Sequence, residues 1–160
     1  DIPITQAWHR DAREEDLLEP DRPAFRQAVY DPIFVNQYNC PLYEDCALWF
    51  VPGSHLRPDL PSEVAACKSR ILQGDDLSYE QREQRGVQYC KGMPGGVCLA
   101  MDAGDFALYH PVAWHLGSVL PYRKRLTLHD HPSSPTTRAW YSQWVAQKAA
   151  KRQADTAAKS

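Results

Sequence analysis

The sequence has no long apolar segment. None of its stretches approaches the roughly 20 consecutive apolar residues that a membrane-spanning helix requires. The first residues also lack the apolar core of a secretory signal peptide. From these absences we expect a cytoplasmic protein that has no membrane partner.

An excess of positive charge is also missing. The 160 residues carry a formal net charge of −2, and the longest basic run is Arg123-Lys124-Arg125. Proteins that bind nucleic acid usually combine a basic patch with a recognisable binding motif, and this sequence has neither. We therefore expect no nucleic-acid partner.

Paired cysteines are absent as well. The chain has an odd number of cysteines, and no two of them have the C-x-x-C spacing: Cys40, Cys46, Cys67, Cys90 and Cys98. This pattern argues against a zinc ribbon and against a disulfide framework. We expect reduced thiols that behave as small apolar side chains.

Long helical patterns are rare before the C-terminal part of the chain. Thirteen prolines and eight glycines are scattered through the sequence, which favours many short elements. β-Branched and aromatic runs bounded by turn residues predict strands over residues 2–9, 33–39, 47–51, 96–101, 106–109, 113–117 and 123–129. Residues 12–32 are acidic and proline-punctuated, and we expect a long loop there.

Two helical regions are expected among these strands. Ser62 could cap a helix that runs to about Leu72, and a shorter helix is expected over 78–85, so that a helical insertion lies near 61–86. After Pro135, aromatic residues recur at helical spacing, with Thr136 or Thr137 as the cap and a frayed tail over 146–160. We therefore expect one mainly β domain over residues 1–160, a sandwich or jelly roll with a helical insertion and a C-terminal helix.

Two residues near the start of the chain have the spacing of metal ligands. His9 and Asp11 lie at positions i and i+2, which on an extended strand puts both side chains on one face. His115, near the end of a short apolar strand, could supply a third ligand. Two imidazoles and one carboxylate suit Fe(II) with open coordination positions, and they could also hold zinc.

Three separated segments carry a family resemblance. They are Trp8-His9-Arg10-Asp11, then Leu48-Trp49-Phe50-Val51-Pro52-Gly53-Ser54-His55, then Gly104-Asp105-Phe106 continuing to Trp114-His115-Leu116-Gly117. In this order and at this spacing, they resemble the phytanoyl-CoA dioxygenase family of Fe(II)/2-oxoglutarate-dependent oxygenases. The resemblance covers roughly residues 5–130.

The resemblance implies a fold, a reaction and a set of site residues. The fold would be a double-stranded β-helix, the cupin-like form of the jelly roll. His9, Asp11 and His115 would hold Fe(II), with 2-oxoglutarate and O2 as co-substrates. The reaction would hydroxylate or otherwise oxidise a C–H bond of a small organic substrate and release succinate and CO2. Because halogenating relatives lack the carboxylate, Asp11 favours hydroxylation or a related oxidation.

Either of two arginines could bind the distal carboxylate of 2-oxoglutarate. Arg125 lies closer to the family's usual distance from the second histidine, whereas the strand Leu126-Thr127-Leu128 aligns better if Arg123 takes the role. A guanidinium suits this task because its fork matches a carboxylate with two hydrogen bonds. We favour Arg125.

Two other function classes fit the same ligands. One is a cupin-like domain that uses zinc or manganese for hydrolysis or isomerisation, and the other is a non-catalytic binding module on the same fold. Only eight residues precede His9, and the chain begins at Asp1. From the resemblance we therefore expect an N-terminal part of the domain to be missing, with which this chain would associate. Residues 12–32 and 61–86 are candidate lids over the substrate.

Overall fold

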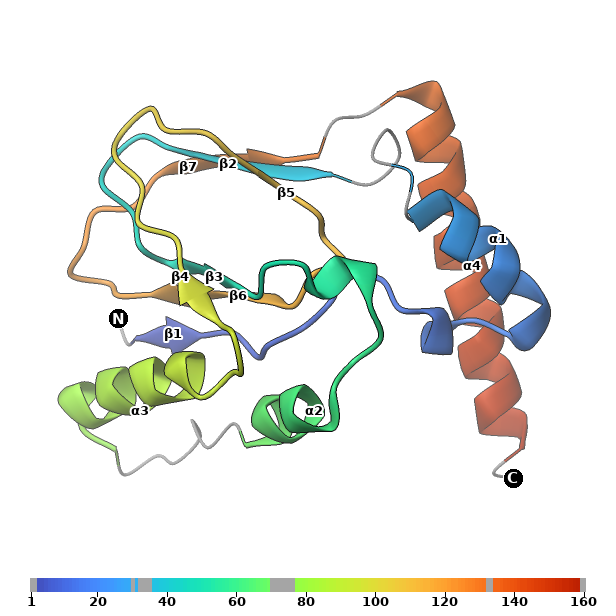
Figure 1. Cartoon of the computed structure of the whole chain (residues 1–160), viewed down its shortest axis with the longest axis horizontal. Helices are drawn as coiled ribbons and strands as arrows, with labels where there is room; N and C mark the ends of the chain where they lie inside the picture. The colour runs from blue at the N-terminus through green and yellow to red at the C-terminus, as the bar shows by residue number, and fades with distance from the viewer. Residues whose placement is uncertain (1–2, 30, 32–35, 70–76, 132–133, 159–160) are drawn as a thin grey trace.

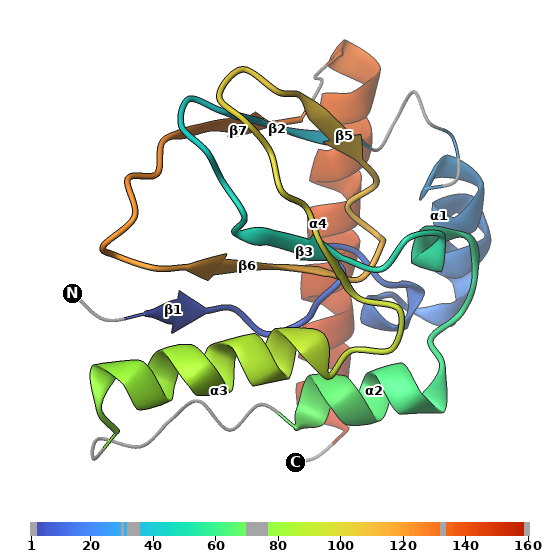
Figure 2. The same ribbon diagram turned by 60° about the vertical axis from the view of Figure 1, so that its left-hand side comes forward.

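The strands form two antiparallel sheets that face each other (Figures 1 and 2). The computed structural model describes residues 3–29, 31, 36–69, 77–131 and 134–158. The larger sheet has the order β1 (Ile4–Thr5), β6 (His115–Val119), β3 (Leu48–Phe50) and β4 (Val97–Cys98). The smaller sheet has the order β5 (Ala107–Tyr109), β2 (Gln37–Pro41) and β7 (Thr127–Asp130).

Helices contribute more residues than strands do. The α-helices of the described residues are α1 (Arg22–Val29), α2 (Pro61–Lys68), α3 (Tyr79–Lys91) and α4 (Pro135–Ala157), and short 3-10 turns span Glu14–Asp16, Glu19–Asp21 and Ser54–Leu56. About 43% of the described residues are helical and 19% lie in strands. The expectation of a mainly β chain was therefore wrong. The fold mixes helices and strands, because the helical segments are longer and the strands shorter than their sequence patterns indicate.

Residues 12–32 do not form the expected loop. They contain two 3-10 turns and α1, whose residues Phe25 and Val29 are buried. Pro23 lies at the second position of α1, in the first turn, where a backbone N–H has no partner within the helix. The prolines therefore start this helix and do not prevent it.

The other helices begin close to the predicted positions. The Ser78 hydroxyl caps α3 by accepting a hydrogen bond from the Gln81 N–H, and α3 continues to Lys91, beyond the expected end. Helix α4 is capped by Ser134, which accepts from the Thr137 N–H, and it continues to Ala157 through most of the segment expected as a tail. The predicted start of a strand at Ile33 and the predicted end of a helix at Leu72 both lie outside the described residues.

Helices α2 and α3 cover the outer face of the larger sheet (Figure 1). The core between them is a single cluster of buried side chains: Trp8, Val51, Tyr89, Cys90, Met93, Trp114 and Leu116. Helix α3 passes so close to β1 that a Cβ at Gly86 would lie 2.5 Å from the Thr5 hydroxyl oxygen. Burial of this face holds the segment around Trp8, next to His9, against the helices.

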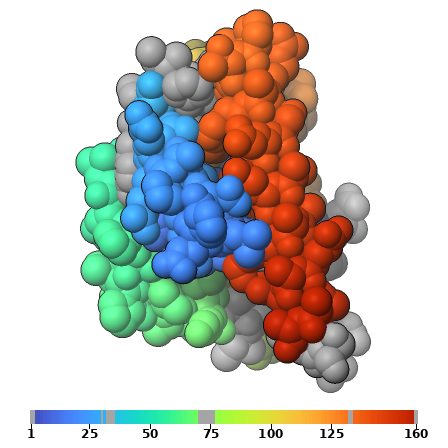
Figure 3. All heavy atoms as spheres, turned by 90° about the vertical axis from the view of Figure 1, so that its right-hand side faces the viewer, coloured from blue at the N-terminus to red at the C-terminus, as the bar shows by residue number. Residues whose placement is uncertain are grey.

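A second apolar cluster joins both ends of the chain. Leu17, Phe25 and Val29 pack with Val112 and Trp144, so that α1 and the turns before it lie against α4. Figure 3 shows the N-terminal segment seated between α4 and the residues that follow β3. No helix in the described part of the chain is both long and apolar enough to span a membrane.

Candidate metal centre

The inward faces of the two sheets border a cavity of about 390 Å³. Polar side chains from both sheets line it: His115 from β6, Gln37 and Asn39 from β2, Tyr109 from β5, and Thr127 and His129 from β7. Apolar residues of β1, β3 and β6, among them Ile4, Leu48 and Val119, complete the lining, while the Leu116 side chain packs in the core cluster on the helical side. Because side chains alternate along a strand, one face of the larger sheet builds the core and the other borders the cavity.

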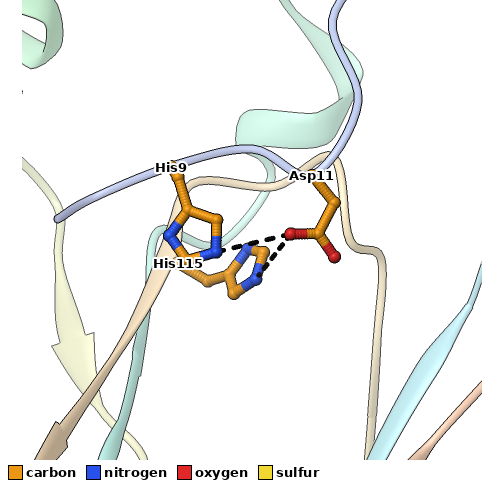
Figure 4. A group of neighbouring side chains, drawn as sticks. All are labelled: His9, Asp11 and His115. Atoms are coloured by element: carbon orange, nitrogen blue, oxygen red, sulfur yellow. Dashed lines mark ion pairs between the residues drawn. The ribbon is translucent and has the colours of Figure 1, made fainter. Parts of the chain in front are cut away.

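His9, Asp11 and His115 meet at one end of this cavity (Figure 4). Each of the three offers a ligand atom, and these atoms lie within 4.8 Å of one another. Asp11 Oδ1 is 3.4 Å from His9 Nε2 and 3.6 Å from His115 Nε2. Among the described residues this is the only group of three or more such side chains that could hold a metal ion. The structure therefore brings the predicted ligand set together.

The backbone fixes the two imidazoles on the same face. The His9 N–H donates to the His115 carbonyl and the His115 N–H donates to the His9 carbonyl, both at 3.0 Å. Directly opposed residues of an antiparallel pair project their side chains to the same side. The ring centroids are accordingly 4.3 Å apart.

Both imidazoles also have the same tautomer. His9 Nδ1 is 2.8 Å from the Ala7 carbonyl and His115 Nδ1 is 2.9 Å from the Ala113 carbonyl. A carbonyl only accepts, so Nδ1 carries a hydrogen in both rings, and Nε2, which faces Asp11, is the atom that can bind a metal once it has lost its proton. Hydrogen bonds of this kind orient the histidine ligands of metals.

Asp11 is held by its second oxygen. The Gln37 side-chain amide donates to Asp11 Oδ2, while the Asp11 N–H donates to the Pro111 carbonyl at 3.0 Å. Burial works against the charged carboxylate, but its hydrogen bond with His9 and the nearby imidazoles lower the pKa of Asp11 below its ordinary value. The same hydrogen bond raises the pKa of His9, whereas burial lowers the pKa of His115.

Arg10 anchors the turn between the two N-terminal ligands. Its side chain is only 8% exposed, and its Nε lies 2.8 Å from Asp59 Oδ1. Its Nη1 donates to the carbonyls of Ser54 and Val112, and its guanidinium lies over the Trp114 ring. Because Arg10 points away from the cavity into these contacts, its neighbours His9 and Asp11 are held facing it.

The two candidate arginines lie in different places. Arg125 lines the cavity that contains the three ligands, and its Nε donates to the buried Asp45 at 3.1 Å. Arg123 is exposed in the turn before β7, outside this cavity, with its Nη1 3.4 Å from the Cys46 sulfur. Arg125 and Thr127 share a partner, since both donate to Asp45.

Several residues of the site were not predicted. Gln37 holds Asp11 and Asp45 holds Arg125, while Asn39 and Tyr109 line the cavity between these pairs. Burial raises the pKa of Tyr109, so its phenol stays protonated as a hydrogen-bond donor. Their signal in the sequence is a polar residue at alternate positions of a strand, which cannot be assigned to a face until the pairing register is known.

The described helices of residues 61–86 do not lie over the site. Helices α2 and α3 pack against the outer face of the larger sheet, opposite the cavity (Figure 2). The lid proposed for this segment is therefore wrong for its described residues.

No protein-family model matches this chain, and a search of curated proteins finds no match. Any assignment of function consequently depends on the site itself.

Proposed function

We propose that this protein is an Fe(II)- and 2-oxoglutarate-dependent dioxygenase of the phytanoyl-CoA dioxygenase type. The observation that carries the proposal is the pair of Nε2 atoms and one carboxylate oxygen converging at the end of a cavity that also contains Arg125. This ligand set is typical of non-haem iron oxygenases, which keep positions open for co-substrate and oxygen. An arginine in the same cavity favours this reaction over a cupin-like hydrolase, which has no need of it.

The strand order supports a jelly roll. In an eight-stranded jelly roll, strands two, seven, four and five form one sheet, and strands one, eight, three and six form the other. The observed orders β1-β6-β3-β4 and β7-β2-β5 match this arrangement when β1 to β7 are counted as the second to eighth strands. No described residue fills the remaining position beside β7.

The residues present fit the metal and its co-substrate. His9, Asp11 and His115 would hold iron through two nitrogens and one oxygen, and both rings already present Nε2. The Arg125 guanidinium, oriented through its Nε by Asp45, would bind the distal carboxylate of 2-oxoglutarate with its remaining N–H groups. The bound iron would supply the oxidative chemistry, in which decarboxylation of 2-oxoglutarate is coupled to oxidation of a C–H bond.

The protein's own contribution is to position these groups and limit access of water. Gln37 and the Pro111 carbonyl keep Asp11 turned toward the histidines. Between the iron ligands and Arg125, the polar side chains Asn39 and Thr127 provide hydrogen-bonding groups for an elongated dicarboxylate. The protonated Tyr109 phenol is a further donor beside His115.

The proposal is tested by conversion of 2-oxoglutarate to succinate. We expect purified protein with Fe(II) to form succinate slowly in air without a prime substrate, and faster when a suitable substrate is added from a screen. The variant His115→Ala should form none, because one of the three ligands is removed. Equal succinate from wild type and His115→Ala, or none from iron-loaded wild type, would refute the proposal.

A further inference from the structure

A second cavity lies on the other side of Asp11. Its volume is about 390 Å³, within the range of small-molecule sites. Asp11 and Gln37 line both this cavity and the one between the sheets. A molecule bound here would therefore lie beside Asp11, a candidate metal ligand, without occupying the space beside Arg125.

Flat aromatic side chains form most of one wall. Trp140 and Trp144 lie nearly parallel on α4, with ring centroids 6.5 Å apart and an angle of 9° between their planes. Tyr141 and His131 continue the surface, with centroids 6.2 Å apart and planes 29° apart. Such a surface favours a flat ring system, which can stack on it with little loss of conformational freedom.

Two buried polar atoms of the lining have no hydrogen-bond partner among the described residues. They are Trp144 Nε1, which is a donor, and Gln37 Oε1, which is an acceptor. Gln37 cannot turn over to satisfy Oε1, because its amide nitrogen donates to Asp11. Since an unpaired buried polar group is costly, a ligand that accepts from Trp144 and donates to Gln37 would remove two such costs at once.

The charges around the cavity disfavour an anionic ligand. No lysine or arginine is among its described lining residues, and Asp11 contributes a negative charge. Lys148, the cation near Trp144, is paired with Asp16 at 2.7 Å. His131 likewise lies 3.3 Å from Asp130. A phosphate or a coenzyme A thioester would therefore find no charge to balance its own.

We propose that the cavity lined by α4 is the prime-substrate site and takes a neutral, flat ring compound that has both a hydrogen-bond donor and an acceptor, such as a lactam or cyclic amide. That the bound compound is a substrate rests on the proposed oxygenase function, whereas its binding can be measured without turnover. Gln37 then has two roles, since it holds Asp11 through its nitrogen and reads the ligand through its oxygen.

The probe for this site is quinolin-2(1H)-one, a flat neutral lactam with a ring N–H beside a carbonyl. Isothermal titration calorimetry with the zinc-loaded protein should show a single site for it, and no comparable binding of the anion naphthalene-2-sulfonate. Gln37→Leu and Trp144→Phe should each weaken binding of the lactam by about tenfold, the loss expected for one buried hydrogen bond. Gln143→Leu, on the exposed side of α4, and Trp49→Phe, outside the cavity, are the matched controls and should bind like wild type.

An N-methylated lactam distinguishes loss of the hydrogen bond to Gln37 from a general loss of binding caused by the substitution. The N-methyl compound should bind wild type about tenfold more weakly, yet Gln37→Leu should not distinguish the two compounds, since the interaction is already absent. The inference would be overturned if wild type did not bind the lactam. It would also be overturned if Gln37→Leu preferred the lactam over its N-methyl derivative as strongly as wild type does. Lactam binding in a protein that makes no succinate would refute only the oxygenase function. Succinate formation without lactam binding would refute only this site.

Discussion

Arg123 and Arg125, the two arginines before β7, differ in their surroundings, so substituting each of them should affect the KM for 2-oxoglutarate differently. We predict that Arg125→Lys raises the KM for 2-oxoglutarate by roughly 10- to 100-fold, because lysine keeps the charge but loses the two-point fork. Arg123→Lys, outside the cavity, should leave this KM unchanged. Steady-state succinate assays measure both. The reverse pattern would assign the anchor to Arg123.

Asp45 is predicted to act through Arg125 and not through the metal. Its Oδ1 accepts from the Ala47 N–H at 2.9 Å, and its Oδ2 accepts from Arg125. Asp45→Asn can keep the first contact but presents an amide to the guanidinium, so the KM for 2-oxoglutarate should rise about tenfold while iron affinity stays near that of wild type. Iron titration and succinate assays on the same samples check this. A matching loss of iron affinity would mean that Asp45 merely supports the fold.

Sequence reasoning could select the three candidate metal ligands but not the residues that hydrogen-bond to them or to Arg125. The i, i+2 spacing of His9 and Asp11, joined to the Trp114-His115 segment, was enough to predict the three side chains that the structure brings together. Their common face arises differently than expected, because Asp11 lies in a bend and His9 is fixed by its pairing with His115. Gln37, Asn39 and Asp45 could not be selected, since nothing local distinguishes a polar residue facing a cavity from one facing water.

Among the elements, α2 depends on one buried carboxylate. The Glu63 side chain is fully buried, accepts two hydrogen bonds from Arg57 at 2.6 and 2.9 Å, and accepts a third from the Leu60 N–H at the helix start. Burial acts to raise its pKa, but these partners prevail and hold the pKa of Glu63 below its ordinary value of 4.5. Its contribution to stability is therefore fully present above about pH 4.5 and is lost as the pH falls through the lowered pKa.

We predict that Glu63→Gln lowers the free energy of unfolding at pH 7 by roughly 1–3 kcal/mol, since a charged acceptor is replaced by a neutral amide. Urea denaturation at a series of pH values should show this difference shrinking below about pH 4.5. Glu15→Gln, at an exposed position, is the control and should change little. A difference that stays constant down to pH 3 would contradict the assigned role of the charge.

Element predictions succeeded where local signals and burial agree. The strand β3 lies where composition indicates it. Helix α1 was missed because Pro20 and Pro23 suggest a loop, and only the packing of Phe25 and Val29 against α4 reveals its apolar face. Long-range packing of this kind overrides local propensity and cannot be derived from a window of sequence.

Across the whole molecule, the candidate metal centre joins segments far apart in the chain. His9 and Asp11 come from the first strand region and His115 from β6, so the complete ligand set exists only when the two segments are paired. Metal binding should therefore stabilise the folded state. At a free metal concentration one hundred times Kd the gain should be about 2.7 kcal/mol.

Chemical denaturation with and without Mn(II) or Zn(II) measures this gain. The variant Asp11→Ala should lose most of it, whereas His55→Ala, which lies outside the ligand group, should keep it. Stabilisation of equal size in wild type and Asp11→Ala would show that the ion binds elsewhere.

The arrangement of two facing sheets followed from the number and spacing of the expected strands, but the share of helix did not. Sequence patterns predict a strand at or near each strand of the described residues, although β7 begins only at Thr127 and β2 continues to Pro41, two residues beyond its predicted end. The order of strands in each sheet requires long-range pairing, of which a single sequence carries no direct record.

The most direct measurement of the central claim is an anaerobic absorption titration. Fe(II) is added to the metal-free protein, followed by 2-oxoglutarate, and the visible spectrum is recorded. If His9, Asp11, His115 and Arg125 form the proposed site, a charge-transfer band should grow to saturation in wild type, require more 2-oxoglutarate in Arg125→Lys, and be absent in His115→Ala. A wild-type protein fully loaded with iron that shows no band in excess 2-oxoglutarate would contradict the account.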